Sequence, residues 1–76
     1  MSPKEAKVIY REIFAMIVEL QGNVEAASFC SSVAENARGI KNNINEWRKV
    51  TPRQAEALEN MKVGLKKWIN GQPGKW

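Results

Sequence analysis

The side chains best suited to chemistry in this 76-residue chain are cations and indole rings in its C-terminal half. Residues 38–76 hold nine of the twelve Lys and Arg residues, all three Trp residues and only three of the eight Glu residues. Residues 1–37 hold three bases and five acids, so the overall charge of +4 is concentrated in the second half. Ammonium and guanidinium groups contact phosphates, and flat rings stack on unpaired bases. This asymmetry favours a nucleic acid, DNA or RNA, as the partner.

The predicted nucleic-acid contacts are the cations of the last helix and of the turn before it, together with the C-terminal ring: Arg48, Lys49, Arg53, Lys62, Lys66, Lys67 and Trp76. Three of these cations flank residues 51–52, where a helix start offers free N–H groups and the positive end of a dipole to a phosphate. Lys62 and Lys66 are four residues apart and therefore share a helix face. The alternative is that these cations form a solvated surface that keeps a small bundle soluble.

The composition excludes most catalytic and metal-binding chemistry. The chain has no His and no Asp, which removes imidazole bases, the usual zinc ligands and the usual carboxylates of calcium sites. Its single Cys, Cys30, lies on the apolar side of a helix and has no His to activate it, so we expect a buried, inert thiol. Gly-rich phosphate loops and paired-Cys motifs are absent. We therefore predict no enzyme activity, no cofactor, no metal site and no small-molecule substrate.

Two segments have the sequence of a helix start. Residues 2–5 (Ser-Pro-Lys-Glu) and residues 51–54 (Thr-Pro-Arg-Gln) each combine a hydroxyl cap, Pro at the first helical position and a side chain that reaches back to the cap. Apolar residues recur after each start at steps of three and four. The spacing predicts a first helix over residues 3–20 or 3–21 and a last helix over residues 52–70.

Between these helices, Asn23 is a suitable cap for a second helix. Its apolar stripe follows alternating steps of four and three: Ala26, Cys30, Val33, Ala37, Ile40, Ile44 and Trp47. One long helix ending near Lys49 fits this rhythm, and so does a helix broken near Gly39 with a short further helix after it. Gly39 and the nearby Asn residues disfavour helix, so we favour a break or kink at residues 39–43. The apolar stripes also predict that Trp47 and Trp68 are mainly core residues.

These elements predict an all-α fold, a small three- or four-helix bundle that forms one domain over residues 1–70, followed by a flexible tail over residues 71–76. No alternating strand pattern or hairpin turn competes with the helices. Gly64 lies inside the last helix beside its apolar stripe. It is interpreted either as a tolerated weak position or as the site of a close approach between helices.

The first helix supports an alternative function because its apolar face is wide, with Ile13, Phe14, Met16 and Ile17 close together. Such a face suits a protein–protein interaction module, either a phage-type modulator or inhibitor of a host protein or a helical homodimer. The apolar run 13–18 has six residues, which is too short for a signal sequence or a membrane span. We therefore expect a cytoplasmic protein of a bacterium, or of a phage in its host, without a membrane partner.

Two stretches of the chain carry a resemblance to known proteins. Residues 29–32 read Phe-Cys-Ser-Ser, and residues 50–58 read Val-Thr-Pro-Arg-Gln-Ala-Glu-Ala-Leu, with Met61 and Trp68 after them. This is similar to a pattern of Phe-x-x-Ser, a short spacer and Leu-Thr-x-x-Gln-x-x-Ala-Leu in small helical accessory proteins of phages and plasmids, with Val50 in place of Leu. The resemblance covers about half of the chain and implies an accessory protein that works near replication or transcription. It assigns no functional residue.

Overall fold

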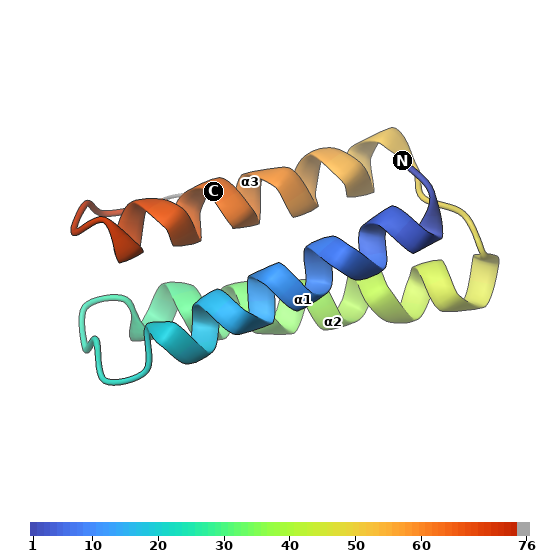
Figure 1. Ribbon diagram of the computed structural model, residues 1–76. Coiled ribbons are helices and arrows are strands. Elements are labelled where there is room, and N and C mark those ends of the chain that lie inside the picture. Colours follow the sequence, from blue (N-terminus) through green and yellow to red (C-terminus); the bar gives the residue numbers. More distant parts are fainter. Residues whose placement is uncertain (75–76) are drawn as a thin grey trace.

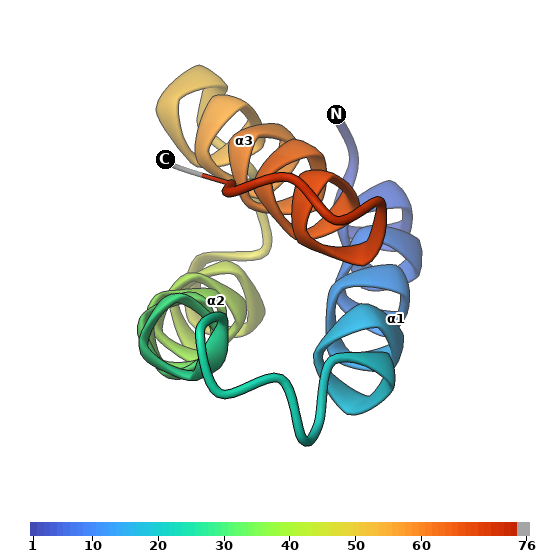
Figure 2. The same ribbon diagram turned by 90° about the vertical axis from the view of Figure 1, so that its left-hand side faces the viewer.

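The computed structural model describes residues 1–74, and these residues form three α-helices and no strand (Figure 1). Helix α1 spans Pro3–Glu19, α2 spans Ala27–Trp47 and α3 spans Pro52–Ile69. α1 and α3 run in the same direction, and α2 runs in the opposite direction. Viewed along the bundle, the helices lie at the corners of a triangle (Figure 2). The predicted all-α fold is confirmed, and it has the three-helix form.

Both predicted helix starts are confirmed. The backbone N–H of Glu5 donates to Ser2 Oγ (3.2 Å), and that of Gln54 donates to Thr51 Oγ1 (3.1 Å). At α3 the capping box is complete, because the backbone N–H of Thr51 donates to Gln54 Oε1 (3.0 Å). Each cap satisfies a backbone donor that helix geometry leaves unpaired, which is worth about 1 kcal/mol.

The favoured break in the second helix is wrong. α2 continues through Gly39, which is exposed, and a Cβ added there would contact nothing. The low helix propensity of Gly costs about 1 kcal/mol. Burial of three side chains on the inner face outweighs this cost: Val33, Ala37 and Ile44. α2 also begins at Ala27 rather than directly after Asn23, whose Oδ1 accepts from the backbone N–H of Ala26 (3.2 Å) in the turn before the helix.

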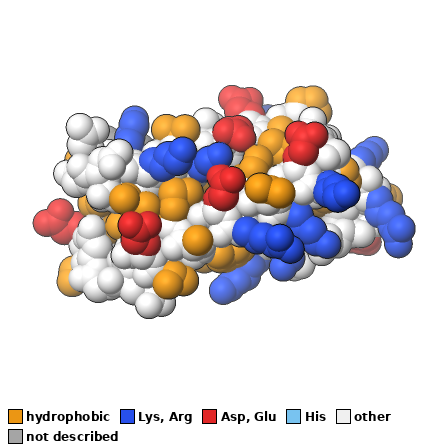
Figure 3. Space-filling view, viewed as in Figure 1, with side chains coloured by type: hydrophobic (Ala, Val, Ile, Leu, Met, Phe, Trp, Pro, Cys, Tyr) orange, Lys and Arg blue, Asp and Glu red, His pale blue; other side chains and the backbone are white. Residues whose placement is uncertain are grey.

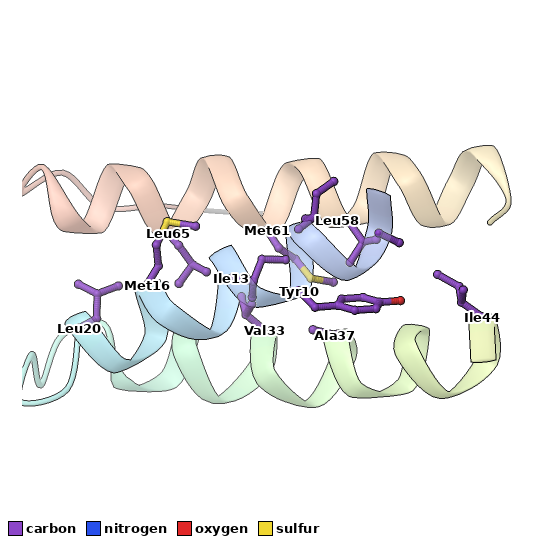
Figure 4. Close-up of a cluster of buried hydrophobic side chains, with 12 residues drawn as sticks. Tyr10, Ile13, Met16, Leu20, Val33, Ala37, Ile44, Leu58, Met61 and Leu65 are labelled. Carbon is purple, nitrogen blue, oxygen red and sulfur yellow. The ribbon is translucent and has the colours of Figure 1, made fainter. Parts of the chain in front are cut away.

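The core lies along α1, which packs more extensively on α3 than on α2 (Figure 4). The largest fully buried side chains come from all three helices: Ile13, Val33, Ile44, Leu58, Met61 and Leu65. α2 and α3 contact each other least. α1 therefore holds the bundle together, and its seam with α2 is the less extensive of its two interfaces.

Trp47 is not a core residue, contrary to the prediction, because it is 62% exposed. A strict seven-residue rhythm drifts by about 20° per repeat relative to a straight α-helix, so three repeats turn the stripe by about 60°. The stripe of α2 is buried at Val33, Ala37 and Ile44 and half-buried at Ile40, and it has left the core by its last residue. Trp68 is half-buried and packs against the core, as predicted.

Residues 71–74 differ from the predicted flexible tail because they fold back onto α3. Gly71 follows the helix with a φ of +82°, a conformation that favours glycine. Trp68 Nε1 donates to the carbonyl of Gly74 (3.1 Å), and Gly74 is buried against the backbone of Gly64. Gly64 therefore marks a close approach, but with the segment after α3 rather than with another helix. Residues 75–76 lie outside the described residues.

Replacing Gly74 with Ala tests this contact. The added Cβ would overlap the carbonyl of Gly64 and crowd the ring of Trp68, so we expect the segment to detach from α3. The free energy of unfolding should fall by about 1 kcal/mol, measured by urea unfolding, because the hydrogen bond to Trp68 is lost.

Gly39→Ala is the matched control, since its Cβ meets nothing. The better helix propensity of Ala should raise the stability by about 1 kcal/mol at that position. Equal stability of Gly74→Ala and the parent protein would contradict a docked segment.

Candidate nucleic-acid interface

The predicted contact residues do not form one surface. Arg48, Lys49 and Arg53 are exposed around the turn between α2 and α3. Lys66 and Lys67 are exposed near the other end of α3, about 20 Å further along the axis at 1.5 Å per residue. The start of α3 is occupied by its own capping box, which uses one of the backbone donors that a phosphate would need. The structure therefore divides the predicted site into two groups of cations.

Lys62, also predicted as a contact, is paired within the fold. Its Nζ lies 2.7 Å from Glu12 Oε2 of α1, and its side chain is only 23% exposed. The hydrogen bond with Glu12 raises the pKa of Lys62, because it stabilises the charged ammonium. Lys62 is therefore a link between α1 and α3 rather than an available phosphate contact. Trp76, the predicted stacking ring, lies outside the described residues.

A different set of cations converges in the seam between α1 and α2, where two adjoining depressions measure about 260 and 290 Å³. Lys7, Tyr10 and Lys41 line both depressions. Arg38 of α2 lies beside the second one, with its guanidinium 5.9 Å from the centroid of the Phe14 ring that lines it. Arg38 itself lines a third depression, which Glu35 also lines. We call this surface the basic groove and define it by its five cations: Lys4, Lys7, Arg11, Arg38 and Lys41. Figure 3 shows Lys and Arg side chains gathered over α1 and α2, below the centre of the view.

α1 sorts its charges onto two flanks. Its three cations follow steps of three and four residues, which places Lys4, Lys7 and Arg11 together on the flank that faces α2. Its three acids recur every seven residues, at positions 5, 12 and 19, and share the other flank. Glu12 shows where that flank points, because it pairs with Lys62 of α3. Among residues 1–74, no carboxylate lines either depression of the basic groove.

The basic groove cannot be recognised from the distribution of charge along the sequence. Three of its five cations lie in residues 1–37, where acids outnumber bases. The other two, Arg38 and Lys41, lie in the basic half but are not among the predicted contacts. The signal that finds the groove is helical spacing, because cations three or four residues apart on each of two helices must share a face.

The residues predicted for a protein interface lie largely inside the fold. Ile13 and Met16 belong to the core, and Ile13 is fully buried. Phe14 and Ile17 are half-buried; Phe14 lines the basic groove, and Ile17 lines a neighbouring depression together with Cys30. Two helices pack on α1, and this explains the width of its apolar face without a partner chain.

Three groups predict a loss of stability at alkaline pH. Burial raises the pKa of the Tyr10 hydroxyl and of the Cys30 thiol, and the hydrogen bond with Glu12 raises the pKa of Lys62. Each group holds its proton more tightly in the folded protein than in the unfolded chain. Its stabilising contribution is therefore present below the unfolded pKa and is lost as the pH rises through the folded pKa. With ordinary pKa values of about 8.5 for Cys and 10 to 10.4 for Tyr and Lys, the loss begins near pH 8.5 and continues past pH 10.

Urea unfolding at neutral and alkaline pH checks this expectation. The chain has no His, so a main stability transition between about pH 5.5 and 8 would contradict the assignment.

Comparison with protein families, curated proteins and solved structures finds no match to this chain. Among residues 1–74, no helix combines the length and the apolar character of a membrane span.

Proposed function

We propose that this protein is a small, non-enzymatic accessory protein that binds nucleic acid through the basic groove. The observation that carries the proposal is that four cations from two helices line two adjoining depressions that no carboxylate of the described residues lines, with Arg38 beside them over the Phe14 ring. Clustered cations of this kind create a local positive potential that attracts a phosphodiester backbone. The proposed nucleic-acid contact surface is thus the seam between α1 and α2 rather than the C-terminal half of the chain.

A strand in the basic groove can continue onto the turn between α2 and α3. The start of α1 and this turn lie at the same end of the bundle (Figure 1). Arg48 and Lys49 follow closely after Asn45, which lines the first depression. These two residues of the predicted set would thus extend the basic groove, whereas Lys66 and Lys67 lie toward the other end of α3.

Salt-dependent titration of the full chain tests the proposal. Labelled single- and double-stranded DNA and RNA are titrated by fluorescence anisotropy at about 50 and 200 mM salt. Each phosphate contact releases counterions, so five contacts predict a slope of log affinity against log salt of about −4.5 on duplex and about −3.5 on single strands. Absence of binding at the lower salt concentration would overturn the proposal.

A further inference from the structure

The hydroxyl of Tyr10 is a buried polar group without a partner. Tyr10 is 5% exposed, and no other buried side-chain polar atom of the described residues lacks a hydrogen bond. Leaving such a group unpaired destabilises a fold, so each case calls for an explanation. Figure 4 shows the ring lying in the bundle with its oxygen pointing toward Ile44. Tyr10 and Ile44 both line the first depression of the basic groove, so the hydroxyl is directed at the wall of that depression.

Three lysines line the same depression, namely Lys4, Lys7 and Lys41, and Asn45 lines it with them. Pro3 lines it as well, so the first turn of α1 and the positive end of its dipole open there. Lysine stems are flexible, so their ammonium groups can turn onto an anion held in this depression, part of whose wall is Tyr10.

The ligand chemistry that fits these groups is a phosphate monoester. Such a group carries a charge of about −1.5 to −2 at pH 7 and has three acceptor oxygens. A phosphodiester within a strand carries only one charge. Three ammonium groups balance the higher charge, and a Tyr hydroxyl is a donor for one of the oxygens.

We propose that the first depression binds the terminal phosphate of a nucleic-acid strand, with Tyr10 donating a hydrogen bond to it and Lys4, Lys7 and Lys41 balancing its charge. This inference rests on the proposed function, because the rest of the strand lies along the basic groove. A free phosphate monoester shares the same chemistry, so the experiment has to separate the two sources.

Three versions of one labelled single strand provide the test, with phosphate at the 5′ end, at the 3′ end or at neither end. We expect the strand phosphorylated at one of its ends to bind about tenfold more tightly than the unphosphorylated strand at the same salt concentration. Lys41→Gln should reduce this preference. Lys66→Gln is the matched control on α3 and should leave the preference intact, because Lys66 lines neither depression.

Tyr10→Phe removes the hydroxyl alone. We expect it to abolish most of the preference for the phosphorylated strand and to lower the affinity for the unphosphorylated strand much less, because the cations of the basic groove are retained. Because the hydroxyl has no partner in the free protein, the variant should be at least as stable toward urea as the parent protein. A purely structural role for the hydroxyl predicts the reverse, a less stable variant that keeps the preference.

The outcomes separate this inference from the proposed function. Measurable binding with equal affinity for all three strands would overturn the terminal-phosphate site and leave the proposed function standing. No binding of any strand at low salt would overturn the proposed function itself. Inorganic phosphate, added at constant ionic strength, distinguishes the two sources. If it weakens binding of the phosphorylated strand but not of the unphosphorylated strand, the result supports a strand terminus. Alternatively, inorganic phosphate could bind and Tyr10→Phe could abolish this binding, while all three strands bind equally. That result would overturn the assignment to a strand end in favour of a free phosphate.

Discussion

Replacing both Lys7 and Lys41 with Glu is expected to lower the affinity for nucleic acid about 100-fold at low salt and to make the salt slope about 2 units shallower. The two residues come from different helices and line both depressions of the basic groove. Their replacement puts two negative charges at its centre, so phosphates are repelled where they were attracted. Both side chains are exposed, so the fold should be retained. Fluorescence anisotropy titration measures the affinity, and circular dichroism checks the fold.

Lys66→Glu combined with Lys67→Glu is the matched control. Both double variants bring the formal net charge from +4 to zero, so a general effect of charge acts equally on the two. Only the location differs, because Lys66 and Lys67 are exposed near the end of α3 and outside the basic groove. A control that loses as much affinity as the groove variant would return the contact surface to the C-terminal half of the chain.

Ile13→Ala should be the most destabilising single substitution considered for this protein. The side chain of Ile13 is fully buried in the core along α1. Its truncation removes apolar contacts within the core cluster and leaves a cavity, which costs about 2–5 kcal/mol. Small domains have only about 5–15 kcal/mol of stability, so the variant should be partly unfolded at moderate temperature. Thermal and urea unfolding followed by circular dichroism measure the loss.

Val18→Ala on the same helix is the control, because Val18 is 62% exposed and should lose less than about 0.5 kcal/mol. The comparison also addresses the protein-interface alternative for α1. If Ile13 served mainly to contact a partner chain, Ile13→Ala would leave the isolated protein as stable as Val18→Ala.

The starts of α1 and α3 could be predicted from the sequence because their signals are local. The caps at Ser2 and Thr51 involve residues within three positions of each other, and the structure retains both. Features that depend on the whole bundle could not be predicted in this way. The low helix propensity of Gly39 favours a break, but burial of the opposite face of α2 in the bundle outweighs it. The seven-residue rhythm predicts a buried Trp47, but the angular drift of a straight helix turns this residue out of the core.

The place of the candidate site could not be predicted from the sequence. Composition indicated a cationic surface, but which cations meet depends on how the helices are paired. Lys62 forms an ion pair with Glu12, which lies far away in the sequence and on another helix, so no local pattern reveals this pairing. Lys7 and Lys41 are likewise distant in the chain and become neighbours only through the packing of α1 on α2.

The most extensive interface of the bundle joins its first helix to its last. Contacts between distant segments form only after the chain between them has been brought into order, which costs loop-closure entropy. A growing chain on the ribosome that stops before α3 has only the lesser α1–α2 seam. Until α3 packs, the side of α1 that faces α3 stays exposed, because Leu58, Met61 and Leu65 are not yet there to cover it. Cooperative folding of the bundle therefore requires α3 and is expected only after α3 has left the exit tunnel.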